Sequence, residues 1–491
     1  MPRWTVWARG VIPATLMACA VYLKEPSDQP AQPTMEPSCT DLVRDGDEVD
    51  VDCGGTCPRC KLGQSCNEDS DCEVDHCANG KCTALPCENG SKDGDETDVD
   101  CGGRTCHPCA GGSICIRNED CFDKICTGGV CHQEYATISF APVVSYPASF
   151  KPYFLVSADF DGDGTTDLAV ANELGSTITT FLGKADGTFT KTASESPTGE
   201  YPTGLVATDF NRDGKVDLAT SNFHGDDITI LLGDGHGGFA PPVHYPAGGK
   251  GSETANLGVG DFNGDGTPDI VATNPSLDSL SVFLGSADGT MSAPSTLTPG
   301  GKGSQPFSVA VGDFNGDSKD DIAAALFGQS SVHVYLGNGD GTFRTDVSYP
   351  AGAIGPYFAI TADINVDGVR DVVLADRGGD SVSVLLGKGD GTFRAAVVSP
   401  TGAGTGPYSV AVVDLNKDGV PDLVTTNFQT NTLSLLLGKG DGRFRDPIHP
   451  DSPGQTPYCI TAVDFNGDGK ADLAIANAIS DDVAVMINTS H

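Results

Sequence analysis

Basic residues are scarce in this chain of 491 amino acids. Lys and Arg together number 29 against 67 Asp and Glu, which gives a net charge of −38. A surface this acidic repels the phosphates of nucleic acids and of anionic membranes, so we expect neither as a partner. Disordered acidic chains lack regular apolar runs, but this sequence repeats short runs such as DLAIAN and VSVLLG. We therefore expect a folded protein whose acidic residues hold cations.

Long apolar runs are also missing, and no segment is a comfortable transmembrane span. The first twenty residues have the outline of an export signal: two early arginines, a short apolar segment from Val11 to Leu16, and then LMAC. Leu16, three residues before Cys19, resembles a bacterial lipobox, in which Cys19 becomes the acylated first residue of the mature chain. Ordinary cleavage after Ala20 and a retained membrane anchor are the alternatives. We expect a secreted or outer-surface-attached protein that meets a membrane only through such a lipid anchor.

Catalytic motifs are the third absence. The sequence contains no GxSxG, no HExxH and no phosphate-binding loop. Its nine histidines lie in the cysteine-rich region or are scattered singly, so none has an obvious catalytic partner. We therefore expect a protein that is not an enzyme.

Cysteine, in contrast, is abundant and unevenly placed. Sixteen of the 18 cysteines lie between Cys39 and Cys131, and their spacing shows one eight-cysteine module that is duplicated with a single inserted residue. In an exported chain this predicts four disulfides per module, because so small a module cannot be held by apolar burial alone. Zinc at the two CxxC pairs and calcium at the acidic turns 45–55 and 93–103 are the alternatives. The pattern resembles cysteine-rich repeats of large secreted bacterial proteins.

Aspartate is concentrated in a segment that recurs seven times. The first copy, DFDGDGTTDL, begins at Asp159, and the steps between successive copies are 50 to 52 residues, which indicates a repeat architecture. Within D-x-[DN]-x-D-G-x-x-D, side-chain oxygens at positions 1, 3, 5 and 9 and a backbone carbonyl at position 7 suit Ca²⁺. Glycine at position 6 permits the sharp turn. Without an ion, carboxylates about 4 Å apart repel each other by roughly 4 kcal/mol per pair, so a bound cation explains why the charge is kept.

Seven loops of this kind predict up to seven calcium sites, and metal-free Asp-Gly turns are the alternative. The expected ligands are Asp159, Asp161, Asp163, Asp167, Asp209, Asn211, Asp213, Asp217, Asp261, Asn263, Asp265, Asp269, Asp313, Asn315, Asp317, Asp321, Asp363, Asn365, Asp367, Asp371, Asp414, Asn416, Asp418, Asp422, Asp464, Asn466, Asp468 and Asp472. The fourth loop departs most from the pattern, because Ser318 stands where glycine is expected.

Each repeat also predicts four short strands. An apolar run precedes the acidic loop, a second follows it, a third ends in a Gly-Asp-Gly turn, and this turn is a strong hairpin signal. Four-stranded units around an axis form a β-propeller, so seven repeats predict an all-β fold of seven blades. The seventh repeat lacks its fourth strand, whereas residues 139–148 match a fourth strand without a blade of their own. We expect this N-terminal strand to complete the last blade and close the ring.

These loops at this spacing resemble the FG-GAP/VCBS repeat family, whose propeller and calcium loops are shared with integrin α-chains. The resemblance covers residues 138–488 and implies a fold and calcium sites more than an activity, because the family includes adhesion proteins, propellers attached to enzymes and proteins of unknown role. Propeller ligands usually bind the face opposite the calcium loops. The residues expected on that face are Phe223, His224, Phe327, Arg377 and Phe428.

We expect a non-catalytic binding or adhesion module whose partner is an extracellular protein or a glycan. A carbohydrate- or lipid-degrading enzyme that uses the propeller face, or a spacer without a ligand, are the alternatives. The expected organisation is a signal peptide at 1–19, a Pro-rich tether at 20–38, cysteine-rich repeats at 39–82 and 87–131, and the propeller at 138–488.

Overall fold

A computed structural model describes residues 138–450 and 453–490, together with short pieces of the cysteine-rich region: residues 60–61, 64–67, 77–78, 80–82, 114–117, 120–121, 126–127 and 129–131. The chain divides into two compact units, and residues 24–135 form one of them. Each unit is described by itself. The expected signal peptide at 1–19 and tether at 20–38 lie outside the described residues.

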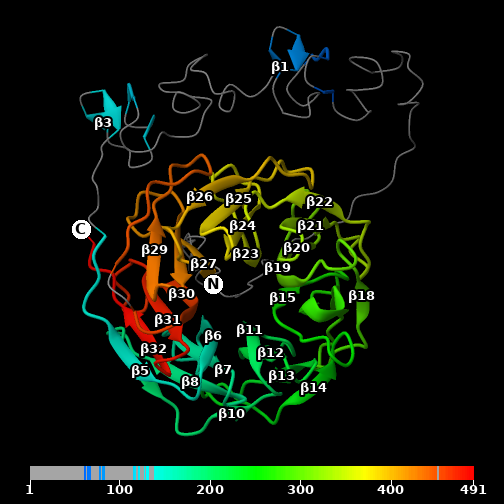
Figure 1. The fold of residues 1–491 in the computed structure, drawn as a ribbon, viewed down its shortest axis with the longest axis vertical. Helices are drawn as coiled ribbons and strands as arrows, with labels where there is room; N and C mark the ends of the chain where they lie inside the picture. Colours follow the sequence, from blue (N-terminus) through cyan, green and yellow to red (C-terminus); the bar gives the residue numbers. More distant parts are fainter. Residues whose placement is uncertain are drawn as a thin grey trace, which may run out of the picture. The chain divides into compact units, whose positions relative to one another are not determined.

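Seven antiparallel sheets are arranged around a central axis, so the predicted seven-bladed all-β propeller is confirmed (Figure 1). The first strand of each blade lies nearest the axis. These inner strands are β6 (Pro152–Ala158), β11 (Pro202–Thr208), β15 (Leu257–Gly260), β19 (Pro306–Gly312), β23 (Pro356–Ala362), β27 (Pro407–Val413) and β30 (Pro457–Val463).

The second and third strands continue each sheet outward. The second strands are β7 (Asp167–Asn172), β12 (Asp217–Asn222), β16 (Asp269–Asn274), β20 (Asp321–Leu326), β24 (Asp371–Asp376), β28 (Asp422–Asn427) and β31 (Asp472–Asn477). The third strands are β8 (Thr177–Gly183), β13 (Asp227–Leu231), β17 (Ser279–Phe283), β21 (Ser331–Tyr335), β25 (Ser381–Leu385), β29 (Thr432–Leu436) and β32 (Asp482–Met486).

The outer strands vary more from blade to blade. They are β9 (Phe189–Lys191) with β10 (Ser196–Pro197), then β14 (Val243–Pro246), β18 (Ser295–Leu297), β22 (Val347–Pro350), β26 (Val397–Pro400) and, for the last blade, β5 (Val144–Pro147). The sixth blade has a three-stranded sheet, and a single bridge between Leu435 and Ile448 stands where its outer strand is expected. A short 3₁₀ helix, η4 (Pro275–Leu277), lies between β16 and β17.

The ring closes as the sequence predicts. Strand β5 pairs antiparallel with β32, in a register that sets Val144 opposite Val485 and Pro147 opposite Asp482. The inner strands also contact one another in order around the axis, and β30 of the last blade contacts β6 of the first. The last blade is therefore built from two distant parts of the sequence, which join the first repeat to the seventh.

The apolar core lies within and between the blades. Every residue of all seven second strands is buried, because neighbouring strands cover their edges and neighbouring blades cover their faces. The second position of each aspartate loop adds a buried apolar side chain. These side chains are Phe160, Phe210, Phe262, Phe314, Ile364, Leu415 and Phe465. Each loop is therefore fixed to the core by the residue beside its first aspartate.

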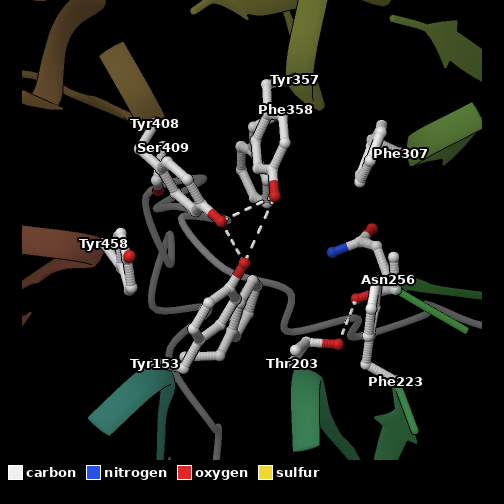
Figure 2. Close-up of a pocket in the computed structure, with 12 residues that line it drawn as sticks. Tyr153, Thr203, Phe223, Asn256, Phe307, Tyr357, Phe358, Tyr408, Ser409 and Tyr458 are labelled. Atoms are coloured by element: carbon white, nitrogen blue, oxygen red, sulfur yellow. Dashed lines mark hydrogen bonds between the residues drawn. The ribbon is translucent and has the colours of Figure 1, made fainter. Parts of the chain in front are cut away.

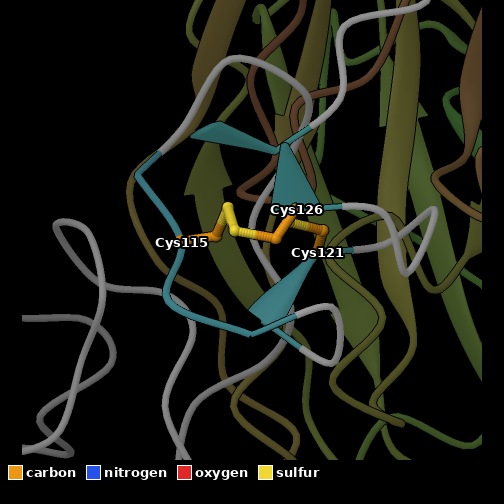
Figure 3. A group of neighbouring side chains, drawn as sticks. All are labelled: Cys115, Cys121 and Cys126. Carbon is orange, nitrogen blue, oxygen red and sulfur yellow. A yellow bond between two sulfur atoms is a disulfide. The ribbon is translucent and has the colours of Figure 1, made fainter. Parts of the chain in front are cut away.

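The described part of the cysteine-rich unit contains two short hairpins in equivalent places. One is formed by β1 (Cys77–Ala78) and β2 (Lys81–Cys82), and the other by β3 (Cys126–Thr127) and β4 (Val130–Cys131). A disulfide joins Cys115 to Cys126, and Cys121 lies beside it (Figure 3). Sulfurs in a disulfide are not thiolates, so this pair is not a zinc ligand. The full pairing and the acidic turns at 45–55 and 93–103 lie outside the described residues, and the four-disulfide framework stays a prediction.

The described residues include no helix with the length and apolar character that crossing a bilayer requires.

Candidate calcium loops and the opposite face

Each aspartate loop joins an inner strand to the second strand of the same blade. Position 1 follows the end of the inner strand and position 9 is the first residue of the second strand, so all seven loops lie at the same end of the propeller. Positions 4 and 6 have positive φ in the loops, for example Gly162 at 75° and Gly164 at 86°. This backbone turns the side chains at positions 1, 3 and 5 back toward the loop's own amides.

The ninth-position aspartate has the same environment in every blade. One carboxylate oxygen accepts the N–H of position 2, and the other accepts an N–H at the end of the third strand, at distances of 2.7–2.9 Å. In six blades that second donor is a glycine; in the seventh it is Asn488. A carboxylate oxygen has two lone pairs, so these bonds leave it able to bind a cation. The aspartate thus ties the loop to the sheet.

Burial raises the pKa of these aspartates. The pKa is raised to about 6 for Asp167, Asp217, Asp269, Asp321 and Asp472, to about 7 for Asp371, and well above its ordinary value for Asp422. The two backbone donors lower it, and the loop's other aspartates raise it by repulsion. A cation beside these carboxylates favours their charged form.

The first loop brings three carboxylates together. Oxygens of Asp159, Asp161 and Asp167 lie within 4.8 Å of one another, a spacing that one cation can bridge. Asp163 instead accepts the N–H and the hydroxyl of Thr165 at 2.7 and 2.6 Å. The structure therefore gathers positions 1, 3 and 9 of this loop, and position 5 is turned toward the backbone of position 7.

The other loops carry asparagine at position 3 and keep the same local bonds. Position 1 accepts the N–H of position 6, and position 5 accepts the N–H of position 7. In the fifth loop Oδ1 of Asn365 is buried and has no hydrogen-bond partner among the described residues. A buried amide oxygen without a donor suits a cation, so the donor set fits Ca²⁺.

The fourth loop accommodates its serine. Ser318 has a φ of 62°, in the left-handed region that glycine occupies in the other loops. Its N–H reaches Oδ2 of Asp313 at 2.7 Å, which is the same bond that glycine makes elsewhere. The substitution therefore adds backbone strain without changing the loop's hydrogen bonds.

The residues predicted for the opposite face do lie at that end. Phe223, Phe327, Arg377 and Phe428 are each the first residue after a second strand, at the start of the turn to the third strand. His224 follows Phe223 and packs at 4.2 Å, between ring centroids, on Tyr201 instead of on Arg377. The structure therefore groups Arg377 with Phe428 and leaves His224 in a separate contact.

Arg377 lies over three aromatic rings. Its guanidinium carbon is 4.4 Å from the ring centroid of Phe428, 5.0 Å from that of Tyr357 and 5.4 Å from that of Tyr408. In the described part of the chain its guanidinium forms no ion pair and no hydrogen bond. The backbone N–H of Arg377 donates to the backbone oxygen of Gly355. Stacking orients a guanidinium while leaving its in-plane N–H donors unused.

An arc of aromatic rings lines the axis beside Arg377. The second residue of five inner strands supplies one ring each: Phe307, Tyr357, Tyr408, Tyr458 and Tyr153. Successive ring centroids are 4.4–4.9 Å apart. This arc was not predicted from the sequence, although four of its members occur in the repeated dipeptide Pro-Tyr and the fifth in Pro-Phe.

Three tyrosine hydroxyls meet inside the arc (Figure 2). The hydroxyl of Tyr357 lies 2.7 Å from that of Tyr408 and 3.3 Å from that of Tyr153, and Tyr153 and Tyr408 also contact each other. Burial raises the pKa of Tyr153 and Tyr408 well above its ordinary value. Tyr153 and Tyr408 therefore stay protonated and can donate as well as accept hydrogen bonds.

The second and third blades interrupt the arc with smaller polar residues, and a cavity of about 30 Å³ lies there. Thr203 gives its hydroxyl to the carbonyl of Ala255 at 3.0 Å. Asn256 is 7% exposed, and its Oδ1 accepts the hydroxyl of Ser308 at 3.2 Å. Its amide nitrogen points toward the tyrosine hydroxyls in Figure 2 and donates to no described residue. The cavity wall thus carries an unused N–H donor.

Comparison with known proteins concerns the propeller. The FG-GAP-like repeat family matches residues 159–220, 209–272, 261–324, 313–374, 363–425 and 421–475, which together span more than half of the chain. No curated protein matches.

Solved structures share the fold at low identity. BBS1N, crystallised in complex with ARL6DN, is 14% identical over 71% of this chain and 96% of its own, with a TM-score of 0.50. Virginiamycin B lyase from Staphylococcus aureus is 13% identical over 71% and 99%, with a TM-score of 0.49. An Agrocybe aegerita lectin that recognises terminal N-acetylglucosamine is 18% identical over 70% and 96%, with a TM-score of 0.45. The likeness to BBS1N shows the propeller fold, and no ligand or reaction is carried over from any of the three.

Proposed function

Because this chain belongs to the FG-GAP-like repeat family, we propose that it is a secreted or surface-attached propeller that calcium stabilises and that binds a ligand without catalysis. The aspartate loops hold the metal at one end of the blades. The aromatic face around Arg377 binds the ligand at the other end. The proposal thus separates a structural role for the acidic residues from a recognition role for the aromatic ones.

The calcium role is supported by the donor set of the loops. Seven loops repeat the same oxygen-rich sequence, and the first brings Asp159, Asp161 and Asp167 to a single point. Extracellular calcium modules bind with Kd of about 10⁻⁴ to 10⁻³ M, so at ~1 mM calcium each site adds roughly 0.4–1.4 kcal/mol. Seven sites at these values add about 3–10 kcal/mol, which is comparable to the net stability of a whole domain.

The binding role is carried by one observation, the stacked Arg377 with no acidic partner in the described part of the chain. Although acidic residues outnumber basic ones more than twofold, the Arg377 side chain forms no ion pair with any of them among the described residues. Stacked arginines and tyrosines are typical of interface hot spots.

An array of glycans and extracellular proteins, probed with the purified protein in millimolar calcium, tests the binding role. We expect retention of a ligand class, and loss of that retention when Phe428 and Arg377 are both replaced by alanine. The degrading-enzyme alternative predicts release of soluble products from polysaccharide or lipid. Such products, or an array with no retained ligand, would contradict the proposal.

A further inference from the structure

We propose that the aromatic face binds a carboxylate-bearing saccharide, with the acid group at Arg377 and a sugar hydroxyl at the amide of Asn256. This inference rests on the proposed binding function and names its ligand class. It combines three features of one surface: a stacked guanidinium, a continuous arc of rings, and an unused amide donor on the cavity wall.

The guanidinium selects an anion of planar shape. The rings of Tyr357, Tyr408 and Phe428 hold Arg377 by its face, so its N–H donors project from the edge. A carboxylate accepts two parallel N–H bonds from this edge, which a hydroxyl or a neutral ester cannot do equally well. In a chain with a net charge of −38, the absence of a described acidic partner keeps this donor set available for a ligand.

The remaining surface suits a sugar better than a peptide terminus. Pyranose rings have apolar faces that stack on aromatic side chains and a polar rim that needs hydrogen bonds. The rings of the arc pack on one another, and those of Phe307, Tyr357, Tyr458 and Tyr153 are only half-buried, so they offer apolar surface to a sugar. The tyrosine hydroxyls and the amide of Asn256 offer hydrogen bonds. The cavity beside Asn256 is too small for a whole sugar but holds a hydroxyl in place of a water.

The acidity of the chain does not prevent this binding. The aspartate loops lie at the far end of the inner strands, and strands of seven residues are about 23 Å long. The Debye length at physiological ionic strength is about 8 Å, so the loops' field is largely screened at Arg377. On the aromatic face itself Glu173 is paired with Lys151, so recognition is decided by the groups that touch the ligand.

Calorimetric titration of the full protein in millimolar calcium tests this inference. The probes are trigalacturonate and its methyl ester, which share the sugar and differ in the carboxylate charge. We expect the acid to bind about tenfold or more tightly than the ester. R377Q should remove this preference, and R377K should keep part of it, because lysine keeps the charge without the planar fork. N256A should lower the affinity for the acid and for the ester by the same factor.

R443Q is the matched control. Arg443 lies on an exposed hairpin and pairs with Asp441 at 3.0 Å, so its loss should change neither titration. Melting curves of each variant verify the fold. Equal binding of acid and ester, or binding of neither, overturns the saccharide assignment, and preference for a peptide with a free carboxyl terminus overturns it in favour of a protein partner. Retention of neutral glycans on the array would leave the binding function standing while this inference fails.

Discussion

Single residues decide how the blades tolerate buried charge. At the end of the second strand, five blades place an asparagine whose amide nitrogen donates to a side chain of the third strand. These residues are Asn172, Asn222, Asn274, Asn427 and Asn477. The fifth blade has Asp376 there, with Oδ2 bonded to the hydroxyls of Ser383 at 2.5 Å and Ser381 at 3.3 Å. Its Oδ1 is buried and has no partner among the described residues.

Burial raises the pKa of Asp376 to about 7. Because the folded pKa exceeds the unfolded value, the group's contribution to stability is full below about pH 4 and is lost as the pH rises through 7. D376N should therefore increase the free energy of unfolding at pH 8 by up to about 4 kcal/mol, which raises the melting temperature there. At pH 4 it should change the melting temperature little. The mirror change N427D should lower the melting temperature at pH 8 only. An increment for D376N that is the same at both pH values would contradict the assignment.

The sequence predicted where the aspartate loops lie, and it predicted the residues of the opposite face only in part; calcium binding by these loops stays a prediction. The loops were found because the residues of such a turn are adjacent in the chain. Arg377 and Phe428 were placed on the correct face for a similar reason, since both begin turns. Asn256 and the tyrosines were missed, because they meet only when five or more blades close around an axis.

At the scale of elements, a turn in one blade holds the next blade. The last residue of the turn between second and third strands has positive φ, and in six blades its side chain accepts an N–H from the loop that precedes the next inner strand. Asp278 of the third blade shows this, accepting the N–H of Gly303 at 2.7 Å and of Gln305 at 3.0 Å. Asp226, Asp380 and Asp481 make the equivalent contacts. Asp481 joins the last blade to Lys151 of the first.

D278A should lower the free energy of unfolding by about 1.5–3 kcal/mol, because it leaves two backbone donors without a charged acceptor. Although burial acts to raise the pKa of Asp278, its backbone donors lower it further, so the net shift is below the ordinary value. The contribution of these hydrogen bonds to the free energy of unfolding is therefore present at neutral pH and is lost as the pH falls through the acid range. D278N should cost less, and D288A, in an exposed hairpin, should cost little. Urea unfolding of the three variants measures how much unfolding free energy each loses. Equal losses in D278A, D278N and D288A would contradict this role of Asp278.

At the scale of the whole molecule, the ring depends on strand β5. Tyr146 of β5 packs on Phe189 and Phe181 of the first blade at 5.7 and 6.2 Å between centroids, and its hydroxyl accepts the N–H of Phe189. One side chain thus links the strand that completes the last blade to the first. Y146A should destabilise the fold by about 1–3 kcal/mol, less than truncation of a fully buried aromatic side chain, because Tyr146 is half-buried; it should also increase cleavage by protease at native conditions. Tyr349 makes a similar contact with Phe393 between neighbouring blades. We expect Y349A to lower the free energy of unfolding by a comparable amount while leaving the pairing of β5 intact. Proteolysis that begins at residues 138–148 should therefore occur in Y146A and not in Y349A.

Calcium is the second whole-molecule prediction. Chelation with EDTA should lower the melting temperature sharply, because about 3–10 kcal/mol of binding energy is withdrawn from seven sites together. Magnesium should restore little of it, because it prefers a tighter octahedron with fewer protein ligands. Replacing Asp159 and Asp161 of the first loop by asparagine should remove only the part of the calcium-dependent stability that one of the seven sites contributes. An unchanged melt in EDTA would rule out calcium as the stabilising ion.

The pairing of β5 with β32 also has a consequence for biosynthesis. Ser139 and Ser490, which bond across the closure, are 351 positions apart in the chain. A nascent polypeptide can form its early blades as they emerge, but it cannot seal the circle until almost every codon of the propeller has been read. Until then two sheet edges stay unpaired and open to aggregation. A product shortened by even one repeat keeps those edges for good, so premature stops should yield material for degradation in place of smaller working proteins.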